Sequence, residues 1–398
     1  MNQSASKWHH VILIAGILLI GMNLRPSITA VSALAERMYQ DGLSRETIGS
    51  LTAIPLVLFG VVGLWAGWMG KLMGFARALG LGLLLIALGC WLRSAPGPME
   101  LVWRMAGTIL LGGGIALGNV LLPGLVKSRY PKHVGVLTSL YATAMNLGAA
   151  SGIAFSVPLA NVLPGDWRSA MAAWGVFAAM VLLLWSPQML APPAARKREH
   201  PLAGVYRLAR QKRAWQVAIY MGLQSWVFFS AVAWLPTLLQ SRGMEEITAA
   251  NWVVTMQLLG CAASLVVPTL AGRSASQTVW TSVCAITAIL GLIGVVFLPG
   301  IGQILSLLLL GLGLNAGFGM VLLVIALRSE SPEVAASLSS MAQATGYLLS
   351  SPGPWLVGLL STTSGGWTLA FGVVILMACI GGVAGYLSGR PGELSFNE

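Results

Sequence analysis

The chain has 398 residues, of which 56% are apolar and only 9% are charged, and its formal net charge is +11. Soluble domains carry about 25% charged residues, so this chain lacks the charges to cover a water-exposed surface, and its hydrophobicity also excludes disorder. We therefore expect a polytopic membrane protein whose basic residues lie in loops between apolar runs, with no role in nucleic-acid binding.

The first apolar run begins at Val11 and superficially resembles a signal peptide. Arg25 interrupts it before the nearest pair of small residues, and many more apolar runs follow, so we interpret it as the first membrane span. A spanning helix needs about 20 mostly apolar residues, and the sequence predicts twelve. The predicted spans are Val11–Leu34, Ile48–Met69, Ala76–Leu92, Leu101–Val126, Val134–Leu159, Ala170–Trp185, Trp215–Leu239, Ala249–Leu270, Thr278–Leu298, Ile304–Leu327, Val334–Leu360 and Trp367–Leu387.

Arg25 is an ionisable residue deep inside the first span. It lies about 14 residues into the span, which is roughly 21 Å along a helix and past the middle of a hydrocarbon core about 30 Å thick. A guanidinium with no carboxylate at that depth favours contact with an anionic substrate. The alternative is a structural role, in which Arg25 binds backbone carbonyls of a neighbouring helix.

Arg104, in the fourth span, is less specific. It shares one helical stripe with Thr108, Gly112 and Asn119, and that stripe is expected to line a cavity. The alternative is that Arg104, which lies near the start of its span, extends its side chain to the lipid headgroups.

Several uncharged polar residues also lie at depth. Buried amides often join helices through hydrogen bonds, so for each amide the alternative to substrate binding is a structural role of this kind. Phe228 shares the stripe of Gln224 in span seven and would pack on a flat ligand. With Arg25 and Arg104, the predicted substrate-binding residues are Asn23, Asn119, Tyr141, Gln224, Phe228, Asn315 and Gln343.

Two halves of the chain repeat at an offset near 198 residues. The segment SLYATAMNLG, which begins at Ser139, corresponds to SLSSMAQATG, which begins at Ser337. The same offset pairs Asn119 with Asn315 and Arg25 with Gln224. Such a duplication predicts two pseudo-symmetric six-helix bundles with substrate bound near the membrane midplane. The expected bounds are 1–189 and 214–398, joined by a basic linker at 190–213.

The linker contains an apolar stripe of Leu202, Val205, Tyr206 and Ala209. The stripe is typical of a short helix on the cytoplasmic leaflet, although a disordered basic linker is the alternative. Sixteen Lys and Arg residues fall in segments that are cytoplasmic if the N-terminus is inside, against five in exterior loops. This asymmetry predicts that both termini are cytoplasmic.

Residues for catalysis and metal binding are missing from the spans. No Asp, Glu or His lies in the central part of any span, so we expect no proton relay and no catalytic set. Transport would then be uniport, exchange, or symport with the proton carried on the substrate or a peripheral group. The four cysteines, Cys90, Cys261, Cys284 and Cys379, are expected to be small buried apolar residues, and we expect no metal or other cofactor.

Twelve spans, a parallel duplication and a long central loop resemble the major facilitator superfamily. The loop between spans two and three reads GWMGKLMGFAR, which keeps the outer glycines of the family signature, Gly67 and Gly74. Lys71 replaces the signature acid, so this chain lacks the carboxylate that forms a salt bridge in other members.

Within that superfamily, four long stretches are similar to the cyanate permease (CynX/NimT) family. They are GMNLRPSITAVSAL in span one, GGGIALGNVLLPGLVK from span four, GLQSWVFFSAVAWLP in span seven and SLSSMAQATGYLLSSPGP in span eleven. The resemblance implies an all-α fold of twelve transmembrane helices and substrates such as cyanate, a small anion, or 2-nitroimidazole, a flat heterocycle.

These observations predict a transporter that moves a small anion such as cyanate by alternating access. The alternative within transport is an exporter of a flat nitrogen heterocycle or drug. A channel or receptor is disfavoured by the repeat and by the glycine-rich spans, and a membrane enzyme by the missing catalytic groups. We expect a monomer in a bacterial inner membrane, whose partners are the lipid bilayer and a small-molecule substrate.

Overall fold

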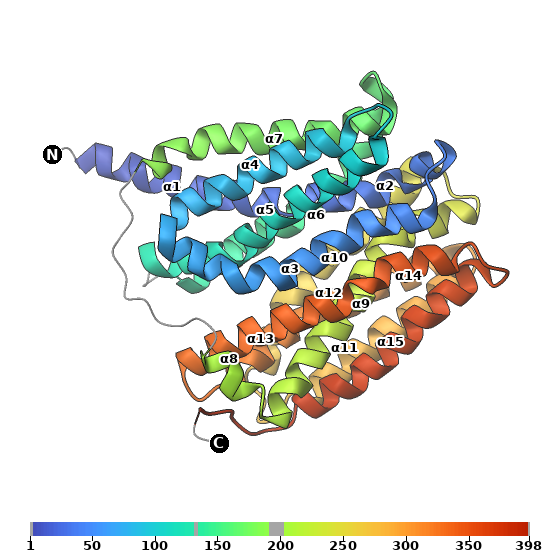
Figure 1. Cartoon of the computed structure of the whole chain (residues 1–398). Helices are drawn as coiled ribbons and strands as arrows, with labels where there is room; N and C mark the ends of the chain where they lie inside the picture. Colours follow the sequence, from blue (N-terminus) through green and yellow to red (C-terminus); the bar gives the residue numbers. More distant parts are fainter. Residues whose placement is uncertain (1–2, 131–133, 191–202, 397–398) are drawn as a thin grey trace. The chain divides into compact units, whose positions relative to one another are not determined.

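The computed structural model describes residues 3–130, 134–190 and 203–396 (Figure 1). These residues form helices joined by short turns, with one isolated β-bridge between Ser329 and Leu394. The helices of the first half are α1 (Gln3–Asn23), α2 (Pro26–Gln40), α3 (Arg45–Met73), α4 (Phe75–Ser94), α5 (Glu100–Arg129), α6 (Val134–Val162) and α7 (Asp166–Met189). Those of the second half are α8 (Ala203–Leu208), α9 (Lys212–Ser241), α10 (Glu246–Ala271), α11 (Thr278–Phe297), α12 (Ile301–Leu327), α13 (Pro332–Ser350), α14 (Pro352–Leu360) and α15 (Gly366–Ser388).

The predicted spans coincide with helices throughout the described chain. Eleven described segments are long and apolar enough to cross a membrane, and α1 with α2 makes up the first of them, Val11–Gln40. The predicted span Val334–Leu360 is divided at Ser351 into α13 and α14, and neither part is among the eleven. The expected all-α membrane fold is confirmed.

The chain divides into two compact units whose boundaries fall inside α2 and α3. Unit 1 contains Met1–Leu34 and Val61–Glu199, and unit 2 contains Ala35–Gly60 and His200–Glu398. The C-terminal part of α2 and the N-terminal part of α3 therefore belong to the same unit as the second half of the chain. The bounds expected from the duplication, 1–189 and 214–398, describe the repeat and stay a prediction.

Glycines bring the helices of each unit into close contact. In unit 1, Gly82 on α4 lies against the carbonyl oxygen of Gly114 on α5, which a Cβ atom at Gly82 would approach to 2.9 Å. In unit 2, a Cβ atom at Gly291 on α11 would lie 2.6 Å from the Cα atom of Leu310 on α12. Small residues allow such approach in membranes, where hydrophobicity gives little attraction between helices. In each half, the third and fourth spans therefore approach closely at a glycine.

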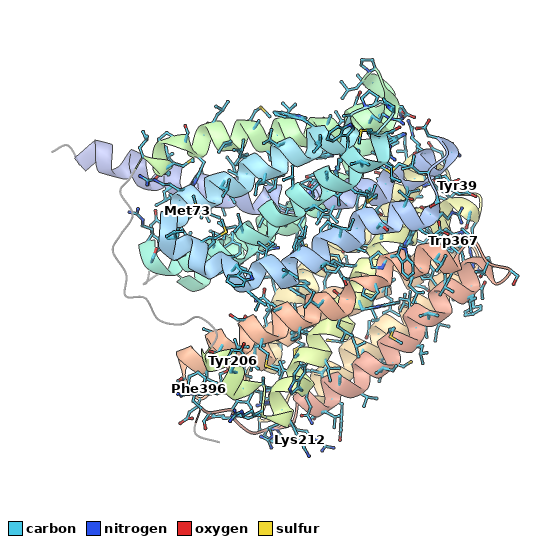
Figure 2. All side chains as sticks on the ribbon, viewed as in Figure 1. Tyr39, Met73, Tyr206, Lys212, Trp367 and Phe396 are labelled. Carbon is cyan, nitrogen blue, oxygen red and sulfur yellow. The ribbon has the colours of Figure 1, made fainter. Side chains whose placement is uncertain are left out.

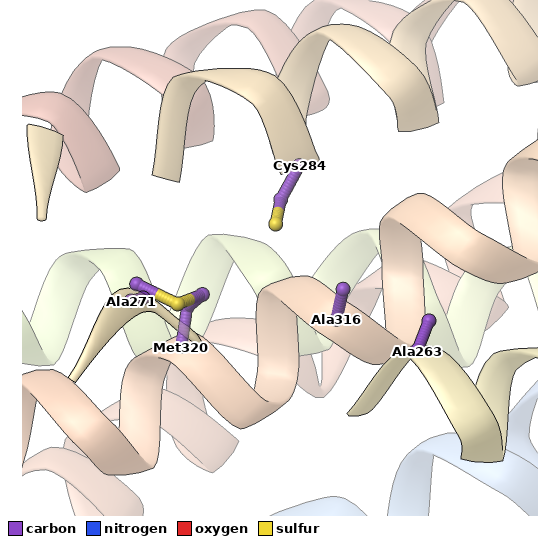
Figure 3. Packing of buried hydrophobic residues seen from close by; sticks show 5 residues of the cluster. All are labelled: Ala263, Ala271, Cys284, Ala316 and Met320. Atoms are coloured by element: carbon purple, nitrogen blue, oxygen red, sulfur yellow. The ribbon is translucent and has the colours of Figure 1, made fainter. Parts of the chain in front are cut away.

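Part of the core of unit 2 consists of four small side chains and one methionine from three helices. Figure 3 shows Ala263 and Ala271 of α10, Cys284 of α11, and Ala316 and Met320 of α12. All four cysteines are free, and the described residues contain no group of His, Cys, Asp or Glu that would hold a metal. Cys90 and Cys284 are buried as expected, whereas Cys379 is exposed and Cys261 is half-buried, so the expectation of four buried cysteines is wrong.

The short helix expected in the linker is present as α8 (Ala203–Leu208). Arg207 stacks on the ring of Phe396, with its guanidinium carbon 5.7 Å from the ring centroid, and Leu208 is fully buried. The linker segment 191–202, for which disorder is the alternative expectation, lies outside the described residues.

Candidate functional site

The first membrane span is broken at Leu24 and Arg25, between α1 and α2. Pro26 occupies the first position of α2, where its fixed φ fits a helix start and its missing N–H is no loss. The Arg25 carbonyl accepts the backbone N–H groups of Ile28 at 3.0 Å and Thr29 at 3.1 Å, so it begins the hydrogen bonding of α2. The break therefore places Arg25 between two half-helices.

Small residues of α5 and α6 support this break. A Cβ atom at Gly148 would collide with the Met22 carbonyl oxygen, and one at Gly118 would collide with the Leu24 side chain. The Thr29 hydroxyl of α2 donates a hydrogen bond of 2.9 Å to the Ala149 carbonyl of α6. The backbone around Arg25 is thus held by close contacts on two sides.

Four predicted binding residues come together around the break, all within unit 1. Asn23 is 2% exposed and Arg25 is half-buried. Tyr141 lies on α6 beside Gly21, where a Cβ atom would be 3.4 Å from that of Tyr141, and Asn119 follows Gly118 on α5. Among the described residues, the buried amide nitrogens of Asn23 and Asn119 have no hydrogen-bond partner. Unused donors at the same helix break as a guanidinium suit an acceptor-rich, negatively charged group.

Arg93 contributes a second guanidinium near the break, and this one is fully buried. Arg93 is 1% exposed, and its Nη2 donates a hydrogen bond of 2.6 Å to the Ser27 carbonyl. Its Nε and Nη1 have no acceptor in the part of the chain that the structure describes. The predicted third span ends at Leu92 and leaves Arg93 in the loop that follows, which is wrong because Arg93 lies in the last turn of α4. Its position at the end of an apolar run gave no signal of burial.

Arg104 lies apart from this group. It is 15 residues before Asn119 on α5, about 22 Å along the helix. Arg104 forms an ion pair with Glu100, whose carboxylate also pairs with Arg168 at 2.6 Å, and its guanidinium carbon is 5.2 Å from the Trp167 ring centroid. The structure thus gives Arg104 a set of partners near one end of α5, and its expected role in binding stays a prediction.

Unit 2 brings together two of the predicted amides on facing helices. Gln224 of α9 donates a hydrogen bond of 2.7 Å to the Leu314 carbonyl of α12, one residue before Asn315. Asn315 donates to Gln257 at 3.3 Å and to the Gly311 carbonyl at 3.0 Å. These bonds match the structural reading of both amides as links between helices, so any role in binding would be additional to it.

An aromatic cluster adjoins Gln224 in unit 2. Phe228 lies one turn after Gln224 and meets Phe229 edge to face at 5.3 Å between ring centroids, and Phe229 contacts Tyr347 of α13 at 6.3 Å. Phe59 of α3 contacts the same tyrosine at 5.3 Å. Gln343 lies one turn before Tyr347 and donates to the Ser339 hydroxyl at 2.8 Å. Phe59 and Tyr347 are not among the predicted binding residues, because only the fold brings them into the cluster of Phe228.

The turn that carries the family-like glycine signature connects α3 and α4. Gly74 has a φ of 85°, a backbone conformation that favours glycine, which explains its presence in the signature. Arg77 donates a hydrogen bond of 3.0 Å to the Met189 carbonyl at the end of α7. The side chain of Lys71, which replaces the signature acid, lies outside the described part.

Aromatic and basic side chains lie at both ends of unit 2 (Figure 2). At one end, Tyr39 and Trp367 flank the Arg45 guanidinium at 4.5 and 4.9 Å from their ring centroids. Tyr206, Lys212 and Phe396 lie at the opposite end. Both ends therefore carry the cationic and aromatic side chains that membrane proteins place at the bilayer surfaces.

Comparisons with known proteins agree with this architecture. The model of the Major Facilitator Superfamily matches residues 11–354. The "Uncharacterized transporter YycB" of Bacillus subtilis is 37% identical over 95% of this chain and 93% of its own length. The 2-nitroimidazole transporter of Escherichia coli is 35% identical over 99% of both chains, and the cyanate transport protein CynX of Escherichia coli is 27% identical over 89% of this chain and 91% of its own.

A solved structure supports the same fold. The D-xylose-proton symporter superposes with a TM-score of 0.74 over 96% of this chain and 98% of its own, at 15% identity. At that identity the likeness concerns the fold alone. The match of the family model across most of the chain shows the identity of the family: this multi-pass membrane protein belongs to the Major Facilitator Superfamily of transporters, which are not enzymes.

Proposed function

We propose that the protein transports a small anion such as cyanate, with Arg25 as the group that recognises its charge. The observation that carries this proposal is the position of Arg25 at the break between α1 and α2, whose surroundings also hold the unused amide donors of Asn23 and, next to Gly118, of Asn119. The Arg93 guanidinium on the Ser27 carbonyl adds positive potential to the same region. One relative of the chain is a cyanate transport protein, which supports this substrate class.

A second candidate is transport of a flat nitrogen heterocycle such as 2-nitroimidazole. A relative that is 35% identical over 99% of this chain is a 2-nitroimidazole transporter, whereas the cyanate transport protein is 27% identical over 89% of the chain. The Phe228, Phe229 and Tyr347 rings offer the aromatic edges and faces on which a heterocycle packs. Under this candidate, Arg25 has the structural role of holding the helix break.

The mode of transport follows from the family and from the charges. We propose alternating access, because the two halves of the chain repeat and the family consists of transporters. The central parts of the spans contain no Asp, Glu or His in the sequence, so uniport or exchange of the anion is favoured over a buried proton relay. We also propose that the protein acts as a monomer in the bacterial inner membrane.

Thermal unfolding of the detergent-purified protein separates the two candidates. The ligand panel holds cyanate, nitrate, formate and bicarbonate beside 2-nitroimidazole and uncharged azoles. A ligand that binds only the folded state at 100 times its dissociation constant adds about 2.7 kcal/mol to stability. The expected result is stabilisation by one or more anions that is lost in Arg25→Gln.

Arg25→Lys is the matched control, because lysine keeps the charge and loses the planar fork. We expect it to retain part of the anion effect that Arg25→Gln loses. Uptake of the stabilising anion into proteoliposomes then tests transport itself. Stabilisation by 2-nitroimidazole alone, equal in the wild type and in Arg25→Gln, would reject the anion and support the second candidate.

A further inference from the structure

Unit 2 contains an arginine-rich pocket at the end that holds Lys212. The cavity of about 120 Å³ lies between the start of α9 and the ends of α12 and α15, and the segment after α15 closes one side. A single buried water needs roughly 10–15 Å³, so the cavity is large enough for a small polyatomic group. Its polar lining is formed by Arg213, Gln216, Arg328, Ser388 and Arg390. We call it the arginine pocket.

Arg328 is the fixed element of the arginine pocket. It is 7% exposed, and its Nε and Nη2 donate to the carbonyls of Ser388 at 3.3 Å and Gly389 at 2.8 Å. Nη2 also donates to Gln277 at the start of α11. The backbone of Arg328 accepts the Leu394 N–H at 2.7 Å, which holds the chain after α15 against the pocket. These bonds fix the guanidinium in place, so Arg328 supplies the pocket with a preorganised positive charge.

Arg213 and Arg390 add exposed charge to the same cavity. The Arg213 guanidinium lies so close to Gly392 that a Cβ atom there would overlap it, and Arg390 stacks on Tyr386 at 5.2 Å from the ring centroid. Burial and the neighbouring Arg213 lower the pKa of Arg328, and the Glu393 carboxylate opposes them. Three guanidiniums beside one carboxylate leave an excess of positive charge at the cavity, which attracts an anion.

We propose that the arginine pocket binds a phosphate group, supplied either by the headgroup of an anionic phospholipid or by free phosphate. Guanidinium groups match the oxygen geometry of phosphate through paired hydrogen bonds, and two of the three arginines are exposed. The pocket lies at the ends of three spans, Lys212–Ser241, Ile301–Leu327 and Gly366–Ser388, where lipid headgroups meet a membrane protein. This site is separate from the residues around Arg25 and does not depend on the substrate.

The test uses the full-length purified protein and three probes. They are phosphatidylglycerol, zwitterionic phosphatidylethanolamine, and sodium phosphate at an ionic strength held constant with sodium chloride. Native mass spectrometry counts bound lipid, and thermal unfolding measures stabilisation by each probe. The pocket variant is Arg213→Gln with Arg390→Gln, and both side chains are exposed, so the fold should be retained. Its matched control is Lys212→Gln with Arg273→Gln, which removes the same charge from exposed residues outside the pocket lining.

We expect the wild type and the control to bind phosphatidylglycerol, and the pocket variant to bind it at least about tenfold more weakly, since charge-assisted hydrogen bonds are lost. Stabilisation by sodium phosphate that is also lost in the pocket variant would make free phosphate a ligand as well. Equal losses in both double variants, or no stabilisation of the wild type by either anionic probe, would overturn the proposal.

A second variant tests the geometry without removing charge. Gly392 has a φ of 134°, and a Cβ atom there would displace the Arg213 guanidinium. Gly392→Ala should therefore weaken phosphatidylglycerol binding several-fold while all three arginines remain. Unchanged binding in this variant would contradict the position of Arg213 in the pocket, and with it the proposal.

Discussion

Gly148 is the residue on which the backbone around Arg25 depends most directly. A Cβ atom at this position would collide with the Met22 carbonyl oxygen and lie 2.9 Å from its carbonyl carbon. These are backbone atoms of α1 next to the helix break, so no side chain can move aside to make room. We expect Gly148→Ala to push α6 away from α1 and to lower the free energy of unfolding by about 1–3 kcal/mol, as overpacking does.

Gly113 provides the control for this substitution. A Cβ atom at Gly113, also inside a helix, would meet nothing within 4 Å. Gly113→Ala should leave stability unchanged or raise it by roughly 0.5–1 kcal/mol, because alanine restricts the unfolded chain and favours helix. Thermal unfolding of both variants in the same detergent measures the difference. Equal stability of the two variants would show that the break does not rely on close contact with α6.

At the scale of elements, an ion pair within unit 2 joins the C-terminal end of α2 to the N-terminal end of α10. Arg37 donates through Nε and Nη2 to both carboxylate oxygens of Glu246, with a shortest distance of 2.7 Å, and both side chains are about one-fifth exposed. Geometry of this kind makes a pair stronger than most surface pairs, although the gain stays near 0.5–1 kcal/mol in a partly solvated position.

Charge reversal tests this link between α2 and α10. Arg37→Glu and Glu246→Arg should each lower the free energy of unfolding, and the double variant should recover most of the loss. Glu245 is the matched control, since its carboxylate accepts from Thr248 on its own helix. Glu245→Arg should not be rescued by Arg37→Glu. Losses that simply add in the Arg37–Glu246 double variant would mean that the pair contributes nothing to the packing of α2.

The helices were predictable wherever a long apolar run in the sequence marks a membrane span. Each predicted span coincides with a helix or a pair of helices, because apolar runs of about 20 residues have few other folds in a bilayer. The two breaks were not predicted, although Pro26 and Pro352 follow them directly and proline restricts the residue before it. A continuous apolar run gives no sign of such a break, because hydropathy depends on the side chains and not on whether the helix continues.

At the scale of the whole molecule, the candidate site was predictable only where chemistry alone identifies a residue. Arg25 is conspicuous as a charge inside an apolar span, and Asn23 on α1, Tyr141 beside Gly21 and the Gly118 neighbour of Asn119 beside Leu24 belong to the same break. Arg93 and the contact between Phe59 and Tyr347 depend on packing between distant segments, which no periodicity reveals. The partners of Arg104 are also tertiary in part, because Arg168 reaches Glu100 from another helix.

The orientation of the molecule in the membrane follows from its loops. The excess of Lys and Arg predicts that the turn between α9 and α10, which contains Glu245, is exterior, and that the turn between α10 and α11, which contains Ala275, is cytoplasmic. Both residues are exposed, and the four native cysteines are free, so they can be replaced before single cysteines are introduced. In intact cells, a membrane-impermeant maleimide should label Glu245→Cys at once and Ala275→Cys only after permeabilisation. The reverse pattern would place both termini outside and would assign the arginine pocket to the exterior leaflet, since α9 begins at the same end of unit 2 as that pocket.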